Sequence, residues 1–208
     1  MRTYAVIPAA GRASRMGRPK LLLPWGEKTV MEHVLSTWRA SRIDRVIVVV
    51  HPLDRSLAEL CTAGGAVVVQ PSRLPADMKA SVLLGLQAVE GLAPRDVDAL
   101  LVAPADMPGL TPQVIDAVIG AYAASLTRDR KPDQQPRIFC PRHQTRRGHP
   151  MLLPWRLADK IRELAADEGL NALLDRHEIE FVDAGENAIA DDFDTPEDYE
   201  RLRAKYAR

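Results

Sequence analysis

The feature that most constrains the fold is a series of short apolar runs that alternate with helix-like segments. Segment 45–50, Arg-Val-Ile-Val-Val-Val, is β-branched almost throughout, which is typical of a parallel strand buried on both faces. Further strands are expected at 3–7, 66–69 and 97–103, between segments whose apolar residues recur at helical spacing, namely 29–41, 56–63 and 80–91. This alternation predicts an α/β fold with a mostly parallel sheet and helices on both faces.

The second half of the chain predicts shorter elements. We expect a helix from Pro112 to about Ala124, a polar excursion over 126–136 and a strand at 138–140. After these come a basic loop, a brief apolar run, two helices and a last strand, at 142–148, 151–153, 155–166, 170–176 and 178–182. A final helix begins after Thr195, which caps it, with Pro196 in its first turn. No boundary divides the chain, so residues 1–208 are expected to form a single domain.

Composition and charge exclude several classes of protein. Lys and Arg number 28, as do Asp and Glu, so the formal net charge is zero. A nucleic-acid-binding protein usually has a basic excess, so no nucleic-acid partner is expected. Two cysteines, Cys61 and Cys140, make no disulfide framework and favour a reduced, cytoplasmic location. No apolar run approaches the roughly 20 residues that span a bilayer, and no signal-peptide pattern opens the chain.

The loop after the first strand is rich in small and cationic residues. Strand residues Val6 and Ile7 lead into Ala9-Ala10-Gly11, and the next nine positions hold Arg12, Arg15, Arg18 and Lys20. Small residues let backbone N–H groups approach an anion, and the cations supply charge to hold it. The loop lacks both the Gly-Lys-Ser/Thr of a P-loop and the G-x-G-x-x-G dinucleotide pattern. It predicts a phosphate site for a nucleoside triphosphate; the alternative is a basic surface turn.

A carboxylate follows the fourth expected strand. Asp106 stands between Pro104 and Pro108, which stiffen the loop around it. Ligands of parallel sheets bind beyond the carboxyl ends of the strands. We therefore expect Asp106 and the basic loop to face one crevice; the alternative is an Asp that merely caps a turn.

The basic loop resembles the signature A-A-G-x-S-x-R-M-G-x-x-K of the MobA-like nucleotidyltransferase superfamily, which has a glycosyltransferase-A-like Rossmann-like fold. Ala13 departs from the signature, and the matching residues are Ala9, Ala10, Gly11, Arg15, Met16, Gly17 and Lys20. The resemblance implies an enzyme that joins a nucleoside triphosphate to a phosphorylated acceptor and releases pyrophosphate. It implies catalytic roles for Arg15, Lys20 and Asp106, and nucleotide contacts from the backbone of residues 9–11. Arg12 and Arg18 are expected to be solvated or at the rim.

The resemblance also implies a Mg²⁺ cofactor, which takes oxygen ligands and stabilises charge on the transferred phosphate. Asp106 resembles the metal-binding Asp of the family. Segment 192–198 resembles the family's D-x-D-T-P-E-D segment, so Asp192 and Asp194 are further candidate metal ligands, with the choice between them open. The alternative is that these acidic residues only cap the helix that follows.

Two further segments resemble family motifs. Met78 and Ser81 match the G-M-x-x-S-L-x-x-G-L segment near the nucleotide, whereas Asp77 stands where glycine is common. A helix-capping or first-turn role is the alternative for Ser81. Arg147-Gly148-His149-Pro150 resembles the R-G-H-P segment of molybdenum cofactor cytidylyltransferases, which implies that Arg147, Gly148 and His149 bind the acceptor. By this resemblance residues 1–125 form the nucleotide-binding part and 137–208 the acceptor-binding part with the C-terminal helix.

The leading hypothesis is a Mg²⁺-dependent transfer of a nucleoside monophosphate, CMP from CTP, to a molybdopterin-type cofactor phosphate. A molybdoenzyme or its chaperone is then an expected partner. The alternatives are transfer to a sugar phosphate or another small phosphorylated acceptor, and a non-catalytic carrier of nucleotide or cofactor. A glycosyltransferase on the same fold is disfavoured because the Pro104-Ala105-Asp106 segment lacks the first Asp of a D-x-D motif. The choice between CTP and GTP and the oligomeric state stay open.

Overall fold

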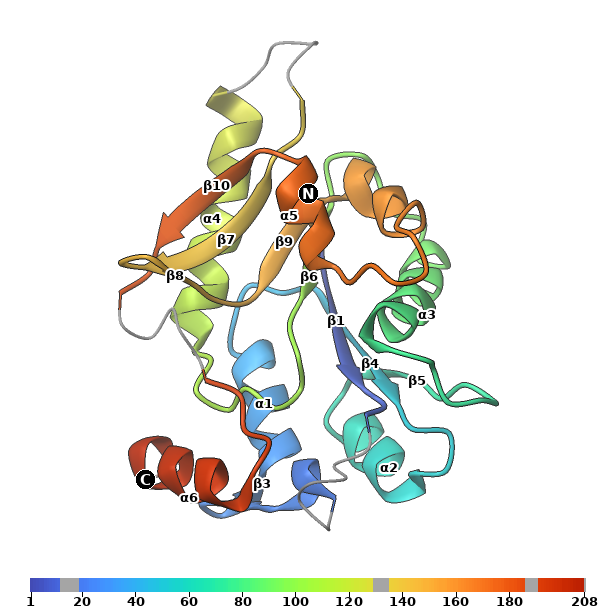
Figure 1. The fold of residues 1–208 in the computed structure, drawn as a ribbon, viewed down its shortest axis with the longest axis vertical. Helices are drawn as coiled ribbons and strands as arrows, with labels where there is room; N and C mark the ends of the chain where they lie inside the picture. Colours follow the sequence, from blue (N-terminus) through green and yellow to red (C-terminus); the bar gives the residue numbers. More distant parts are fainter. Residues whose placement is uncertain (12–18, 129–134, 186–190, 208) are drawn as a thin grey trace.

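The computed structural model describes residues 1–11, 19–128, 135–185 and 191–207. Within them, eight strands form one sheet in the order β10-β7-β9-β6-β1-β4-β5, with β8 paired to β7 (Figure 1). The strands are β1 Thr3–Ala9, β4 Arg45–Val50, β5 Val67–Val69, β6 Ala99–Val102, β7 Ile138–His143, β8 Arg146–Arg147, β9 Met151–Pro154 and β10 Ile179–Asp183. A small separate hairpin pairs β2 (Pro24–Trp25) with β3 (Lys28–Thr29).

Most of the sheet is parallel, as predicted. Strand β1 pairs parallel to β4 and β6, β4 pairs parallel to β5, and β10 pairs parallel to β7. Strand β9 is antiparallel to both of its neighbours, β6 and β7. The carboxyl ends of β1 and β6 therefore lie at the same edge of the sheet.

Helices cover both faces of the sheet, which confirms the α/β prediction (Figure 1). The helices are α1 Val30–Arg39, α2 Arg55–Ala63, α3 Met78–Glu90, α4 Pro112–Arg128, α5 Asn171–Arg176 and α6 Pro196–Tyr206, with 3-10 turns η1 Lys20–Leu22 and η2 Trp155–Ile161. Alternate residues of β1 enter two separate cores: Ala5 and Ile7 pack with α1, α4 and α6, whereas Tyr4 and Val6 pack with α3, η2 and α5. This is the period of two that a doubly covered strand requires.

Helix α3 lies unusually close to β1. A Cβ atom added at Gly85 would overlap the side chain of Val6, so only glycine permits this approach. The first turn of α3 is thereby fixed beside the carboxyl end of β1.

Helix α6 packs on the β2–β3 hairpin through aromatic side chains. Phe193 and Tyr199 are almost fully buried, and the Tyr199 ring lies 6.2 Å from that of Trp25. The Tyr199 hydroxyl also donates to the carbonyl of Pro24. Thr195 caps the helix by accepting from the Asp198 amide at 3.1 Å, as predicted.

Three predicted segments differ in detail. Residues 155–161 form a 3-10 turn instead of the α-helix predicted over 155–166, because buried Leu157, Ala158 and Ile161 suit either spacing. Helix α4 continues to Arg128, so the expected excursion does not begin at Leu126, which packs against the core. Residues 129–134 lie outside the described part. The basic loop 142–148 is partly a β7–β8 hairpin.

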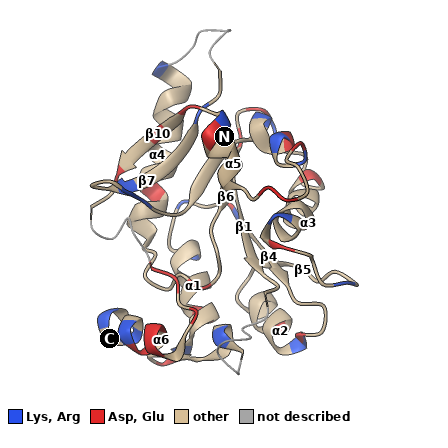
Figure 2. Cartoon of the chain, viewed as in Figure 1, with Lys and Arg blue, Asp and Glu red and all other residues tan. Residues whose placement is uncertain are grey.

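Figure 2 shows Lys and Arg interspersed with Asp and Glu along both halves of the chain. Across the described ranges, none of the helices combines the length and apolar character that a membrane span needs.

Candidate active site

Lys20 joins three segments that are far apart in the sequence. Its ammonium group donates to the Asp106 carboxylate, to the Phe193 carbonyl at 3.2 Å and to Asp194 Oδ1 at 3.1 Å. Lys20 comes from η1, Asp106 from the loop after β6, and the other two residues from the segment before α6. The side chains of Lys20 and Asp106 are only 17% and 16% exposed. The fold therefore brings the predicted lysine and the predicted strand-end carboxylate into direct contact.

The electrostatics of this cluster favour a charged lysine. Burial opposes the charge, but the Asp106 carboxylate and then Asp194 outweigh it, so the pKa of Lys20 is raised above its ordinary value. Asp106 Oδ1 is buried and has no hydrogen-bond partner among the described residues. A buried carboxylate oxygen without a partner is costly, and it is the kind of atom that a bound cation satisfies.

A cavity of about 340 Å³ opens beside the cluster. It is lined by seven of the predicted nucleotide-binding and catalytic residues: Ala9, Ala10, Gly11, Lys20, Met78, Ser81 and Asp106. At Gly11 an added Cβ would meet no atom of the described residues within 4 Å, so none of them fills the space beside this backbone. The carboxyl ends of β1 and β6 and the first turn of α3 thus form three sides of one pocket.

The first turn of α3 explains the departure at Asp77. The Asp77 side chain caps the helix by accepting from the Ala80 amide at 2.7 Å. Ser81 is 4% exposed and its hydroxyl donates to the Asp77 carbonyl at 3.2 Å. This hydroxyl therefore has a first-turn partner inside the helix, whereas Met78 lines the pocket with half of its side chain exposed.

A second cavity, of about 580 Å³, adjoins the first. Asp77, Met78 and Pro104 line both of them. Its wall contains the three predicted acceptor residues, Arg147, Gly148 and His149. Asp192 and the loop 167–171 line the same cavity. Apart from Arg15, which lies outside the described residues, the predicted nucleotide and acceptor residues therefore line two neighbouring cavities.

His149 is a neutral group in this second wall. Burial lowers its pKa, outweighing the Val102 carbonyl and the Asp192 and Asp106 carboxylates, and the nearby Arg147 adds to the lowering. Its Nδ1 atom is buried without a hydrogen-bond partner in the part of the chain that is described. Arg147, from β8, donates to Asn171 Oδ1 at 3.5 Å and remains exposed.

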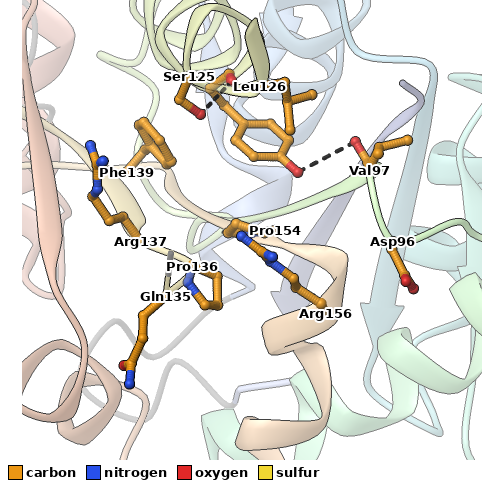
Figure 3. A pocket seen from close by; sticks show the side chains of 11 residues that line it. Asp96, Val97, Ser125, Leu126, Gln135, Pro136, Arg137, Phe139, Pro154 and Arg156 are labelled. Carbon is orange, nitrogen blue, oxygen red and sulfur yellow. Dashed lines mark hydrogen bonds between the residues drawn. The ribbon is translucent and has the colours of Figure 1, made fainter. Parts of the chain in front are cut away.

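A third cavity, of about 210 Å³, lies at the opposite end of the strands (Figure 3). It is bordered by Val97, ahead of β6, and by Arg137, ahead of β7, where Arg137 pairs with Glu178 and Glu180. Parallel sheets bind substrates at their carboxyl edge, so this cavity is not the candidate active site.

Comparison with known proteins decides the family. The model of the MobA-like NTP transferase domain matches residues 5–181. The chain belongs to this family. The solved nucleotidyl transferase from Methanothermobacter thermautotroptrophicus superposes with a TM-score of 0.77 at 23% identity, covering 99% of this chain and 97% of that one, so the two share the fold.

Curated relatives of this MobA-like NTP transferase include a 2-C-methyl-D-erythritol 4-phosphate cytidylyltransferase from Tolumonas auensis. It is 34% identical over 182 residues, which cover 77% of this chain and 76% of the relative. The chain spans only about half the length of several other relatives with that name, such as 51% of the one from Ralstonia nicotianae. A nicotine blue oxidoreductase from Paenarthrobacter nicotinovorans is 26% identical over 95% of this chain and 94% of its own length.

The two candidate metal ligands before α6 lie in different places. Asp194 contacts Lys20 beside Asp106, whereas Asp192 lines the second cavity with His149. In the described ranges of this MobA-like NTP transferase, no three His, Cys, Asp or Glu side chains gather as a metal site. Arg15, the third predicted catalytic residue, lies outside the described residues, as do Arg12 and Arg18.

Sequence reasoning missed two groups in the site. The Phe193 carbonyl accepts from Lys20, and Lys79 holds the loop behind the second cavity. A backbone acceptor leaves no signal in a sequence. Lys79 does leave one, since it is a lysine within the largely apolar helix pattern of 78–90.

Proposed function

We propose that this MobA-like NTP transferase transfers CMP from CTP to a phosphorylated acceptor with release of pyrophosphate. The observation that carries the proposal is the contact of Lys20 with Asp106 and Asp194, because Lys20 and Asp106 line the first cavity, which adjoins the second. A cation among carboxylates at a strand edge suits a triphosphate and its counter-ion. The names of the cytidylyltransferase relatives support cytidine as the base.

The proposed acceptor is a molybdopterin-type cofactor phosphate. The Arg147-Gly148-His149-Pro150 segment supports this choice, because Arg147, Gly148 and His149 lie in the wall of the second cavity. A volume of about 580 Å³ also falls in the range that takes ligands of pterin size. A small phosphorylated polyol, as in the relatives' name, is the rival acceptor. A molybdoenzyme or its chaperone would be the protein that receives the product.

The residues present fit a divalent cation. Asp106 offers a buried oxygen without a hydrogen-bond partner in the described part, and Asp194 presents a second carboxylate around the same ammonium group. We propose that these two hold Mg²⁺, and that Asp192 serves the second cavity instead. When bound, the ion would neutralise charge on the transferred phosphate.

The chain's own residues have simple tasks in this reaction. An acceptor phosphate is already a nucleophile, so alignment and charge stabilisation suffice. Lys20 is charged and reaches the edge of the nucleotide cavity, where it would hold phosphate oxygens. Arg147 would hold the acceptor phosphate, and neutral His149 would orient it by a hydrogen bond.

The direct test is pyrophosphate release with Mg²⁺, each of the four nucleoside triphosphates, and a panel of acceptors. The panel contains a molybdopterin-type cofactor, methylerythritol phosphate and several sugar phosphates. Release with CTP and the pterin alone is expected. Release with methylerythritol phosphate or a sugar phosphate would discard the acceptor but keep the transfer. Nucleotide binding without release from any pair would favour a carrier.

A further inference from the structure

Lys79 is a buried lysine that the proposed reaction does not use. It lies in the first turn of α3 and is 9% exposed. Its ammonium group donates to the carbonyl of Ala165 and, at 3.1 Å, to the carbonyl of Ala166. These carbonyls are 86 and 87 residues away in the sequence, so the contact is a long-range one between α3 and the segment after η2.

The segment that Lys79 holds forms one wall of the second cavity. Residues 167–171 line that cavity. Two other contacts shape the same turn: the Ala165 amide donates to Glu168 Oε2 at 2.8 Å, and the Glu168 carboxylate pairs with Arg176 of α5. Of these contacts, the two hydrogen bonds from Lys79 connect the turn to helix α3, which packs on the sheet.

Helix α3 is a rigid base for such a tie. Gly85 fixes it against β1, and its first turn borders both cavities through Asp77 and Met78. Lys79 is buried whereas Ala165 and Ala166 are exposed. The buried ammonium group needs these two acceptors, since an unpaired buried charge is costly, and it gives the two carbonyls a donor. An apolar residue at position 79 would fill the space without supplying one.

We propose that Lys79 is a positioning residue: it anchors loop 165–171 to α3 and so sets the shape of the cavity that takes the acceptor. The anchoring follows from the contacts alone, whereas its effect on the acceptor rests on the proposed function. Lys79 itself borders the second cavity and is not among the residues that line the nucleotide cavity. Its loss should therefore weaken acceptor binding and leave nucleotide binding in place.

The anchoring is tested without any substrate, by hydrogen–deuterium exchange of Lys79→Met. Amides of 164–172 are expected to exchange roughly 10-fold faster or more, because the turn loses its tie to α3. Lys79→Arg keeps charge and donors and should restore most of the protection. Lys79→Gln, which keeps one donor group, replaces the Met variant if that variant does not fold. The matched control is Lys28→Met, whose exposed lysine donates to Ser36. Unchanged exchange at 164–172 would overturn the proposal.

In the proposed reaction, loss of Lys79 should change KM for the acceptor but not the other kinetic constants. In Lys79→Met, KM for the acceptor should rise roughly 10-fold, with KM for the nucleotide and kcat close to those of the parent protein. Rescue by Lys79→Arg supports positioning, and an equal rise in both KM values would contradict it. If the parent protein transfers nucleotide to no acceptor, the proposed function fails, while the exchange experiment still decides the anchoring.

Discussion

Lys20 illustrates how one side chain holds a site together. Two carboxylates, Asp106 and Asp194, approach the same ammonium group. Without that cation their charges would repel one another in a half-buried place. Lys20 therefore stabilises the segment before α6 on the strand edge, in addition to the phosphate-binding role proposed for it.

Removing the Asp106 carboxylate should remove turnover while the protein still folds. Asp106→Asn keeps the shape of the side chain and is expected to lower kcat by about 100-fold or more, since charge stabilisation at the reacting phosphate is lost. Pyrophosphate release and circular dichroism measure the two effects. Asp159→Asn, at an exposed carboxylate paired with Arg162, is the control. Normal turnover in Asp106→Asn would reject the assignment.

Truncating Lys20 should act mainly on the nucleotide. A hydrogen bond to a charged group contributes about 1.5–3 kcal/mol, so Lys20→Ala is expected to lower kcat/KM for CTP by roughly 10- to 100-fold. The measurement is steady-state kinetics at saturating acceptor. Lys28→Ala, an exposed lysine, should leave kcat/KM unchanged. An unaltered value in Lys20→Ala would refute the phosphate role.

The burial of His149 predicts that the folded protein loses stability in acid. Burial lowers its pKa in the folded state below the ordinary value near 6.5. Between the two pKa values the unfolded chain binds more protons, so stability falls as the pH drops below about 6.5. Denaturant unfolding of the parent protein and of His149→Gln, from pH 8 to pH 5, measures this. The stability of the parent relative to the variant should decrease toward pH 5; a pH-independent difference would contradict the prediction.

At the residue scale the sequence predicts groups that carry their own signal. Lys20 and Asp106 stand at fixed places after strands, and both line the predicted crevice. The partners of Lys79 and Lys20 that are backbone carbonyls have no such signal, because any residue supplies one. The resemblance also left open which of Asp192 and Asp194 is the candidate metal ligand, and only the fold shows that the two lie in different places.

At the scale of elements, glycine at position 85 decides how closely α3 approaches β1. Gly85→Ala forces a Cβ into Val6, and overpacking of this kind costs about 1–3 kcal/mol. Thermal unfolding should show a Tm about 2–10 °C lower.

The matched control for Gly85→Ala is Gly120→Ala in α4. There the added Cβ meets no atom within 4 Å, and alanine gains up to about 1 kcal/mol of helix propensity. The control should therefore raise Tm or leave it unchanged. Equal shifts for both variants would show that the approach to β1 does not matter.

The elements near the N-terminal half follow from the sequence more closely than the later ones. The apolar run 45–50 is β4 to the residue, because only a buried strand accommodates it. The direction of strand β9 could not be predicted from its apolar sequence, since its antiparallel pairing depends on the neighbouring strands β6 and β7. The 3-10 form of η2 likewise depends on tertiary contacts, such as the hydrogen bond that the Trp155 amide donates to the Asp98 carbonyl.

At the scale of the whole molecule, nucleotide binding should stabilise the fold. A ligand at 100 times its Kd adds about 2.7 kcal/mol, which corresponds to a Tm rise of about 5–10 °C for a chain of this size. Thermal unfolding with Mg²⁺ and each nucleoside triphosphate measures this, and CTP is expected to give the largest rise. Lys20→Ala should reduce the shift. No shift with any nucleotide would reject the first cavity as the nucleotide site.

The position of Asp194 has a consequence for protein synthesis. Its contact with Lys20 spans 174 residues, and the contact of Asp106 with Lys20 spans 86. At a translation rate of roughly 5–20 residues per second, Asp194 follows Lys20 by about 10–35 s. From about halfway through that interval, when Asp106 has been added, the nascent chain has both Lys20 and Asp106 but still lacks Asp194 and the Phe193 carbonyl. The contacts of Lys20 are therefore complete only after almost all of the sequence has been translated, and an interrupted chain lacks part of the proposed nucleotide site.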